Sequence, residues 1–152
     1  MHKETPTEAA YGEWEWWAYK GDTGVVGVSI ISADTGGYYD SYDLDWGTTE
    51  VLKFTRWVSP ATEDVLMTTA ASYASASTWH KFRVTRSSAG VFTLYMDNVL
   101  ISVAGGSGAN PTAAQSSHTT SSYMVLYMNI AGQRISLGDT AGNYAFTKRL
   151  LA

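Results

Sequence analysis

Apolar and polar residues alternate over short segments of the chain, and clusters of turn-forming residues separate these segments. Alternation with a period of two is typical of a β-strand with one buried face, and no segment shows the 3.6-residue spacing of an amphipathic helix. Strands are expected at residues 11–20, 25–33, 38–46, 50–58, 64–70, 78–86, 91–97, 99–103, 123–130, 135–137 and 144–150. Many short strands joined by hairpin turns predict an all-β fold, an antiparallel β-sandwich of the jelly-roll type.

The hairpin over residues 78–97 has the clearest pattern. Phe82 and Val84 share one face of its first strand, and Phe92 and Leu94 share one face of its second strand. The Ser-Ser-Ala-Gly sequence between them is a turn signal, so we expect the two strands to pair antiparallel.

The length of 152 residues indicates one domain with a core of its own. Residues 1–10 are polar, and we expect them to form a flexible N-terminal arm. A single domain is then expected over residues 11–152. Within it, residues 104–122 are nearly all small or polar and predict one long loop.

The composition bears on partners and cofactors. Only 16% of the residues are charged, compared with about 25% in an average globular domain. This indicates a surface that is partly covered, as in an oligomer or an assembly. The absence of cysteine excludes disulfides and cysteine-based zinc sites. His2, His80 and His118 are not spaced as metal ligands, so neither a metal nor another cofactor is expected.

The net charge of −4 conceals an asymmetry. Residues 1–50 contain two lysines and ten acids, which gives 2 − 10 = −8, whereas residues 51–152 contain eight basic and four acidic residues, which gives +4. An acidic chain argues against nucleic-acid binding. The two halves either pack against oppositely charged neighbours or mix their charges within the fold.

The N-terminal segment and the apolar runs bear on location. The N-terminal sequence MHKETPTEAA has no apolar segment of the kind found in a signal peptide. The longest apolar run, Val25–Ile31, is far too short to span a bilayer. We therefore expect synthesis in a host cytoplasm and no membrane contact.

Residues 78–101, TWHKFRVTRSSAGVFTLYMDNVLI, resemble a signature of the concanavalin A-like lectin/glucanase superfamily, in its laminin-G-like branch. The residue after Asp97 is Asn98 instead of the usual glycine, and asparagine also tolerates the left-handed conformation of a tight turn. The first and last strands resemble those of such domains in bacteriophage virion proteins. The resemblance implies a concanavalin A-like jelly roll, a fold that hosts lectins, hydrolases and structural modules.

Glu13 and Glu15 share one face of the first expected strand, while Trp14 and Trp16 are expected to enter the core. A retaining glycosidase needs two carboxyl groups about 5–5.5 Å apart. Glucanases of the resembling superfamily carry Glu-x-Asp-x-x-Glu or Glu-x-Asp-x-Glu on one strand. In this chain Glu15 replaces the aspartate, and Trp17 stands at one of the two positions of the final glutamate. The motif is therefore broken, and no catalytic residue is predicted.

Residues 36–47, GGYYDSYDLDWG, combine three carboxylates with three tyrosines. Aromatic rings stack on sugars and carboxylates accept hydrogen bonds from sugar hydroxyls. Calcium also binds carboxylates, but the EF-hand spacing is absent. A solvated or partner-covered strand is the alternative interpretation. The residues expected to contact a ligand are Trp17, Tyr39, Asp40, Tyr42, Asp43 and Asp45.

The hairpin over residues 78–97 also contains His80, Arg83 and Arg86. His80 has no nucleophile motif near it, and the resemblance implies a structural role for this position. Arg83 and Arg86 are expected on the outer face of the strand, where they would pair with acids or with a neighbouring subunit.

Together these features predict a non-enzymatic protein. The expected function is that of a bacteriophage structural or adhesion protein in the virion, of the capsid-decoration or fibre-head type. Its expected partners are capsid or other virion proteins, which the arm over residues 1–10 would contact by pairing with a sheet edge, and cell-surface glycans. The alternatives are a free-standing carbohydrate-binding module or lectin, and a glycoside hydrolase that uses Glu13 and Glu15.

Overall fold

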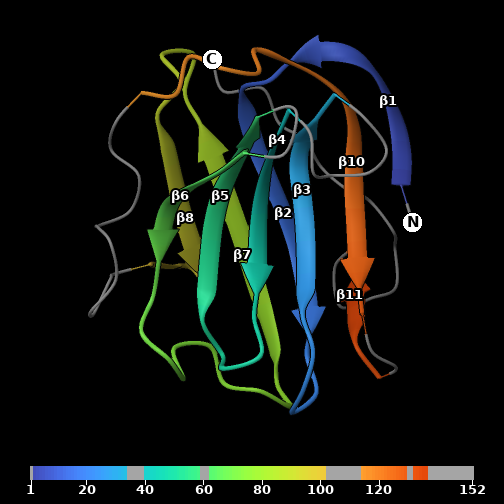
Figure 1. The fold of residues 1–152 in the computed structure, drawn as a ribbon, viewed down its shortest axis with the longest axis vertical. Helices are drawn as coiled ribbons and strands as arrows, with labels where there is room; N and C mark the ends of the chain where they lie inside the picture. Colours follow the sequence, from blue (N-terminus) through green and yellow to red (C-terminus); the bar gives the residue numbers. More distant parts are fainter. Residues whose placement is uncertain (1, 34–39, 59–61, 102–113, 130–131, 137–152) are drawn as a thin grey trace.

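The computed structural model describes residues 2–33, 40–58, 62–101, 114–129 and 132–136. Within these residues the protein is all-β, with eleven strands in two antiparallel sheets (Figure 1). The prediction of an antiparallel β-sandwich is confirmed. No helix in the described part of the chain is long and apolar enough to cross a membrane.

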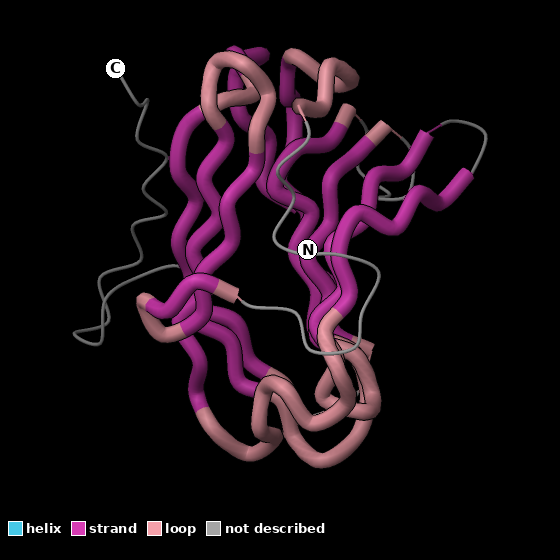
Figure 2. The backbone as a smooth tube through the Cα atoms, turned by 90° about the vertical axis from the view of Figure 1, so that its left-hand side faces the viewer, coloured by secondary structure: helices cyan, strands magenta, loops and turns pink. Residues whose placement is uncertain are grey.

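One sheet has six strands in the order β1–β10–β3–β4–β5–β6. These strands are β1 (His2–Ala9), β10 (Thr120–Met128), β3 (Val26–Ser32), β4 (Ser41–Trp46), β5 (Leu52–Val58) and β6 (Thr62–Thr68). Figure 2 shows the two sheets as facing layers, and the β5–β6 hairpin bends away from the other sheet.

The second sheet has five strands in the order β11–β2–β7–β8–β9. These strands are β11 (Arg134–Ser136), β2 (Gly12–Tyr19), β7 (Trp79–Arg86), β8 (Phe92–Met96) and β9 (Val99–Leu100). The expected β7–β8 hairpin is confirmed by its antiparallel register. The expected strand over residues 144–150 and much of the expected loop over 104–122 lie outside the described residues.

The expectation of a flexible arm over residues 1–10 is corrected. Residues His2–Ala9 form β1, which pairs antiparallel with β10 at the edge of the six-stranded sheet. The polar sequence did not reveal this because strand pairing uses backbone N–H and C=O groups, which every residue except proline carries in full.

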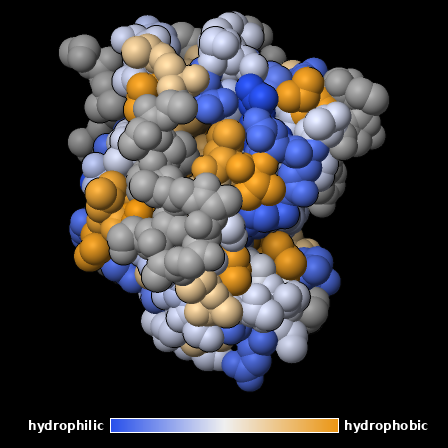
Figure 3. Space-filling view, turned by 60° about the vertical axis from the view of Figure 1, so that its left-hand side comes forward, coloured by the Kyte–Doolittle hydropathy of each residue, from blue (hydrophilic) through white to orange (hydrophobic). Residues whose placement is uncertain are grey.

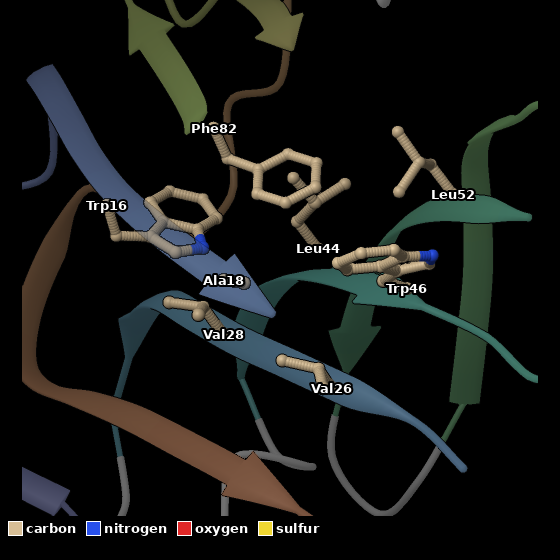
Figure 4. Close-up of a pocket in the computed structure, with 8 residues that line it drawn as sticks. All are labelled: Trp16, Ala18, Val26, Val28, Leu44, Trp46, Leu52 and Phe82. Atoms are coloured by element: carbon tan, nitrogen blue, oxygen red, sulfur yellow. The ribbon is translucent and has the colours of Figure 1, made fainter. Parts of the chain in front are cut away.

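The core lies between the sheets and is rich in aromatic residues. Trp14 and Trp16 are each 2% exposed, as expected from their alternation with the glutamates. Figure 4 shows Trp16 and Phe82, from the five-stranded sheet, opposite apolar residues of β3 and β4. The cavity between them measures only about 10 Å³, so it is a packing defect and not a ligand site.

Lys20 is a buried cation at the end of β2. Its ammonium group lies 3.0 Å from Glu50 and 5.7 Å from the centre of the Trp46 ring, and its side chain is fully buried. We expect E50Q to destabilise the protein by about 2–4 kcal/mol, because it leaves this buried charge without its carboxylate. Urea unfolding measures the change.

The exposed ion pair between Glu15 and Lys81 provides the control. Because Glu15 is 37% exposed in its side chain, E15Q is expected to cost about 1 kcal/mol or less. If E50Q and E15Q lowered the free energy of unfolding equally, a special role for the Lys20–Glu50 pair would be contradicted.

Candidate functional site

The six residues predicted to contact a ligand do not form one site. Trp17 lies on β2 in the five-stranded sheet, whereas Tyr42, Asp43 and Asp45 lie on β4 in the six-stranded sheet. Asp40 directly precedes β4 and has a positive φ of 50°. Tyr39 lies outside the described residues.

Tyr42 belongs to the core. Its side chain is fully buried, its ring lies 4.7 Å from that of Phe92 between centres, and its hydroxyl donates to the backbone carbonyl of Ser117 at 3.2 Å. Burial raises the pKa of this hydroxyl, so it stays protonated. Tyr42 alternates with Asp43, and this places its ring on the face that packs against the other sheet.

Asp43 and Asp45 lie on the opposite face of β4, which points away from the five-stranded sheet. In the sheet register Asp43 is the partner of Ser29 and Thr55, and Asp45 is the partner of Lys53. We call this outer side of the six-stranded sheet the polar face. It comprises Gly27, Ser29, Asp43, Asp45, Lys53, Thr55, Trp57, Glu63, Val65 and Tyr127.

Two aromatic residues border the polar face. A Cβ atom at Gly27 would lie 1.9 Å from Tyr127 Cζ, so the tyrosine ring lies directly over the glycine. On the other side of β4, Trp57 of β5 is half-buried and pairs with Ser41 and Glu63. Neither residue is among those predicted from the sequence to contact a ligand. Two signals were present in the sequence. Strand β3 contains a glycine, which marks a close approach, and Trp57 lies an odd number of positions from the core residue Phe54 along β5, which places it on the opposite face.

Burial shapes the electrostatics of the polar face. Removal from water is the main cause that raises the pKa of Asp45 to about 7, Lys53 opposes this change, and Glu63 adds to it. Lys53 and Glu63 form an ion pair in which both side chains are about one-third exposed. Asp45 thus changes its charge near neutral pH, beside an ion pair that water still reaches.

Two polar atoms of this face have no hydrogen-bond partner among the described residues. They are Asp45 Oδ1 and Thr55 Oγ1, and both are buried. Buried polar atoms in folded proteins normally have a partner, and of these two side chains only Asp45 is partly exposed, so its carboxylate is the acceptor that a ligand hydroxyl can approach. The described residues contain no cluster of three His, Cys, Asp or Glu side chains that could hold a metal ion.

Glu13 and Glu15 lie on the outer face of the five-stranded sheet. Arg83 lies 3.2 Å from Glu13 and Lys81 lies 2.9 Å from Glu15. The acids of the first third of the chain therefore pair with bases of the second third through the β2–β7 register, and the two charged halves of the sequence mix. Both carboxylates are engaged by cations, which favours a structural role over a catalytic one.

Ser75, His80 and Asp97 come together in the order of a catalytic triad. His80 Nδ1 lies 2.6 Å from Asp97 Oδ2, and Nε2 lies 3.3 Å from Ser75 Oγ. However, Nε2 also lies 3.1 Å from the backbone carbonyl oxygen of Ser75, which can only accept. Nε2 thus lies near two oxygen atoms of the same residue, and its contact with the carbonyl favours a structural role over a nucleophile–base pair.

Arg86 contradicts its expected position on the outer face. It shares the alternation of Phe82 and Val84, and it is only 3% exposed. Its guanidinium donates to the backbone carbonyls of four residues at 2.5–2.9 Å. These residues are Ala10, Gln115, Ser117 and His118.

Comparison with solved structures identifies the fold. A tetrameric galectin from the ball sponge Cinachyrella is 14% identical with a TM-score of 0.58, covering 90% of this chain and 96% of that chain. Sheep galectin-11, in complex with glycerol, is 6% identical with a TM-score of 0.54, covering 89% and 96%. The β-glucanase of Bacillus licheniformis is 16% identical with a TM-score of 0.47, covering 93% and 61%.

These similarities show the concanavalin A-like jelly-roll fold, and they confirm the fold that the resemblance implies. No protein-family model matches the sequence, and no curated protein sequence matches it. The expected link to bacteriophage virion proteins stays a prediction.

Proposed function

We propose that this protein is a non-enzymatic, lectin-like domain that binds a glycan on its polar face. The observation that carries the proposal is a face on which the half-buried rings of Trp57 and Tyr127 border Asp45, whose Oδ1 has no hydrogen-bond partner among the described residues. Sugar hydroxyls donate to such oxygens, and the apolar face of a sugar ring packs against aromatic side chains. The galectin-like fold supports the same proposal.

The surroundings of the polar face suit a hydrophilic ligand. Figure 3 shows hydrophilic surface along the β5–β6 side of the molecule next to an apolar area. Val65 of β6, which belongs to the polar face, is 40% exposed. The Lys53–Glu63 pair adds a cation and an acid that still reach water. A glycan on this face would find hydrogen-bond acceptors, a donor and apolar surface together.

The test is a glycan array followed by titration of the best glycan. We expect W57A to weaken binding about tenfold or more, which corresponds to about 1.4 kcal/mol. The matched control is W79A, because Trp79 is 39% exposed and lies on the other sheet. A blank array, or equal affinities for W57A and the unchanged protein, would remove the proposal.

Glycoside hydrolysis is the second candidate, and one observation favours it. A carboxyl group with a pKa of about 7, such as that of Asp45, is suited to donate a proton at neutral pH. A nucleophile is then needed on the same strand, but Asp43 is fully buried. Turnover of a polysaccharide panel that disappears in D45N would support hydrolysis, and no turnover would leave glycan binding alone.

The virion is our prediction for the place where such a domain acts. The polar face and the structural similarities do not bear on it. Sedimentation of nuclease-resistant particles from the source, followed by mass spectrometry, tests this prediction. Recovery of the chain in fixed proportion to a capsid protein would support it, and a chain that stays in the supernatant would contradict it.

A further inference from the structure

A groove of about 390 Å³ lies at the end of the sandwich where β7 ends, the upper end in Figure 1. The β7–β8 turn forms one side and the segment before β10 forms the other. Its lining is mostly small or hydroxyl-bearing and includes Ser87, Ser88, Gly90, Gln115, Ser116 and Thr119. The volume falls in the range of small-molecule sites, and the groove does not include the polar face.

Arg86 is the buried cation in the lining of this groove. Among the described residues no carboxylate forms an ion pair with it. Its two Nη atoms donate to four backbone carbonyls, whereas its Nε–H has no partner in the described part of the chain. The groove is therefore lined by a residue whose positive charge has no counter-charge among the described residues.

A buried cation of this kind is costly until an anion lies near it. The carbonyl dipoles satisfy the hydrogen bonds of the Nη atoms, but they do not supply a negative charge. The rings of Tyr42 and Phe92, 5.2 and 5.0 Å from the guanidinium carbon, attract the cation but carry no charge either. An oxyanion in the groove would supply the missing counter-charge.

We propose that the groove at Arg86 is a binding site for a small oxyanion, namely the carboxylate or sulfate of an acidic saccharide. The hydroxyl groups of Ser87, Ser88 and Ser116 then contact the rest of the ligand. The assignment to a saccharide rests on the proposed function, whereas the oxyanion chemistry rests on Arg86.

Nuclear magnetic resonance of the intact protein tests the proposal directly. The probes are sulfate, glucuronate and glucose, and the signals are the Arg86 Nε–H and the backbone N–H groups of Gly90 and Ser116. We expect sulfate and glucuronate to shift these signals and glucose to leave them unchanged. Tighter binding of glucuronate than of sulfate identifies a saccharide, and equal binding identifies the oxyanion alone as the recognised group.

Two variants separate the charge of the groove from the stability of the fold. S88D places a carboxylate at the exposed rim of the groove and leaves Arg86 intact, and it is expected to weaken glucuronate binding at least about fivefold. A71D is the matched control, because it adds the same charge to an exposed turn at the opposite end of β7.

Three results would overturn the proposal: an Arg86 Nε–H signal that no probe moves, an equal response to glucose, or unchanged affinity in S88D. Signals of Thr55 and Trp57 report the polar face in the same spectra. A result against oxyanion binding in the groove is thus distinguishable from a result against glycan binding on the polar face.

Discussion

R86M is expected to destabilise the protein by about 4 kcal/mol or more, the largest loss that we predict for a single side chain. Arg86 makes four charge-assisted hydrogen bonds to backbone carbonyls, and each such bond contributes about 1.5–3 kcal/mol. Methionine fills a similar volume but leaves these buried carbonyls without a donor. Urea unfolding followed by tryptophan fluorescence measures the loss.

R86K and R83M complete this experiment. Lysine keeps the charge but has three donors for four acceptors, so R86K is expected to lie between the unchanged protein and R86M. Arg83 is on the outer face, 3.2 Å from Glu13 and stacked on Tyr95, and R83M is expected to cost about 1 kcal/mol or less. If R86K and R83M lowered the free energy of unfolding by equal amounts, the carbonyl contacts of Arg86 would have no special effect on stability.

D45N is expected to stabilise the protein at pH values above neutral and to have little effect in acid. Burial raises the pKa of Asp45 to about 7, above the ordinary value of about 4 in the unfolded chain. Between these values the folded protein holds more protons than the unfolded one, so stability falls as the pH rises. Across this range the unchanged protein loses up to about 4 kcal/mol through this one group, and asparagine removes that loss.

Unfolding of D45N and of the unchanged protein at about pH 3 and about pH 8 measures this effect, since these values bracket the two pKa values. The difference in unfolding free energy between the two proteins should grow as the pH rises. A difference that is the same at both pH values would show that the Asp45 carboxyl group is not perturbed by its surroundings.

Strand positions were predictable because one face of each strand is buried. Trp14 and Trp16 alternate with Glu13 and Glu15, and this local signal does not depend on which strands pair. The same rule, applied strictly, places Tyr42 with the core and Arg86 beside Val84. The expectations for these two residues failed because the strand position buries a polar or aromatic side chain as it buries an apolar one.

The composition of the polar face was not predictable in the same way. Tyr127 meets Gly27 because β10 pairs with β3, a partnership across most of the chain. Trp57 and Glu63 join Asp45 on one face only because β4, β5 and β6 are neighbours in a particular register. Pairing between distant strands follows from the packing of the whole sandwich, and a single sequence contains no local signal for it.

The four contacts of Arg86 have a consequence for the order in which the protein folds during synthesis. Three of the carbonyls that Arg86 binds belong to Gln115, Ser117 and His118, which are translated well after it. β1 and β3 also depend on β10, which follows these residues in the chain. While the ribosome still holds this segment, the emerging sheets have no partner for β1 and only one of the four acceptors of Arg86, the carbonyl of Ala10. The sandwich therefore closes only after the last third of the chain has emerged, as expected for a fold dominated by distant contacts.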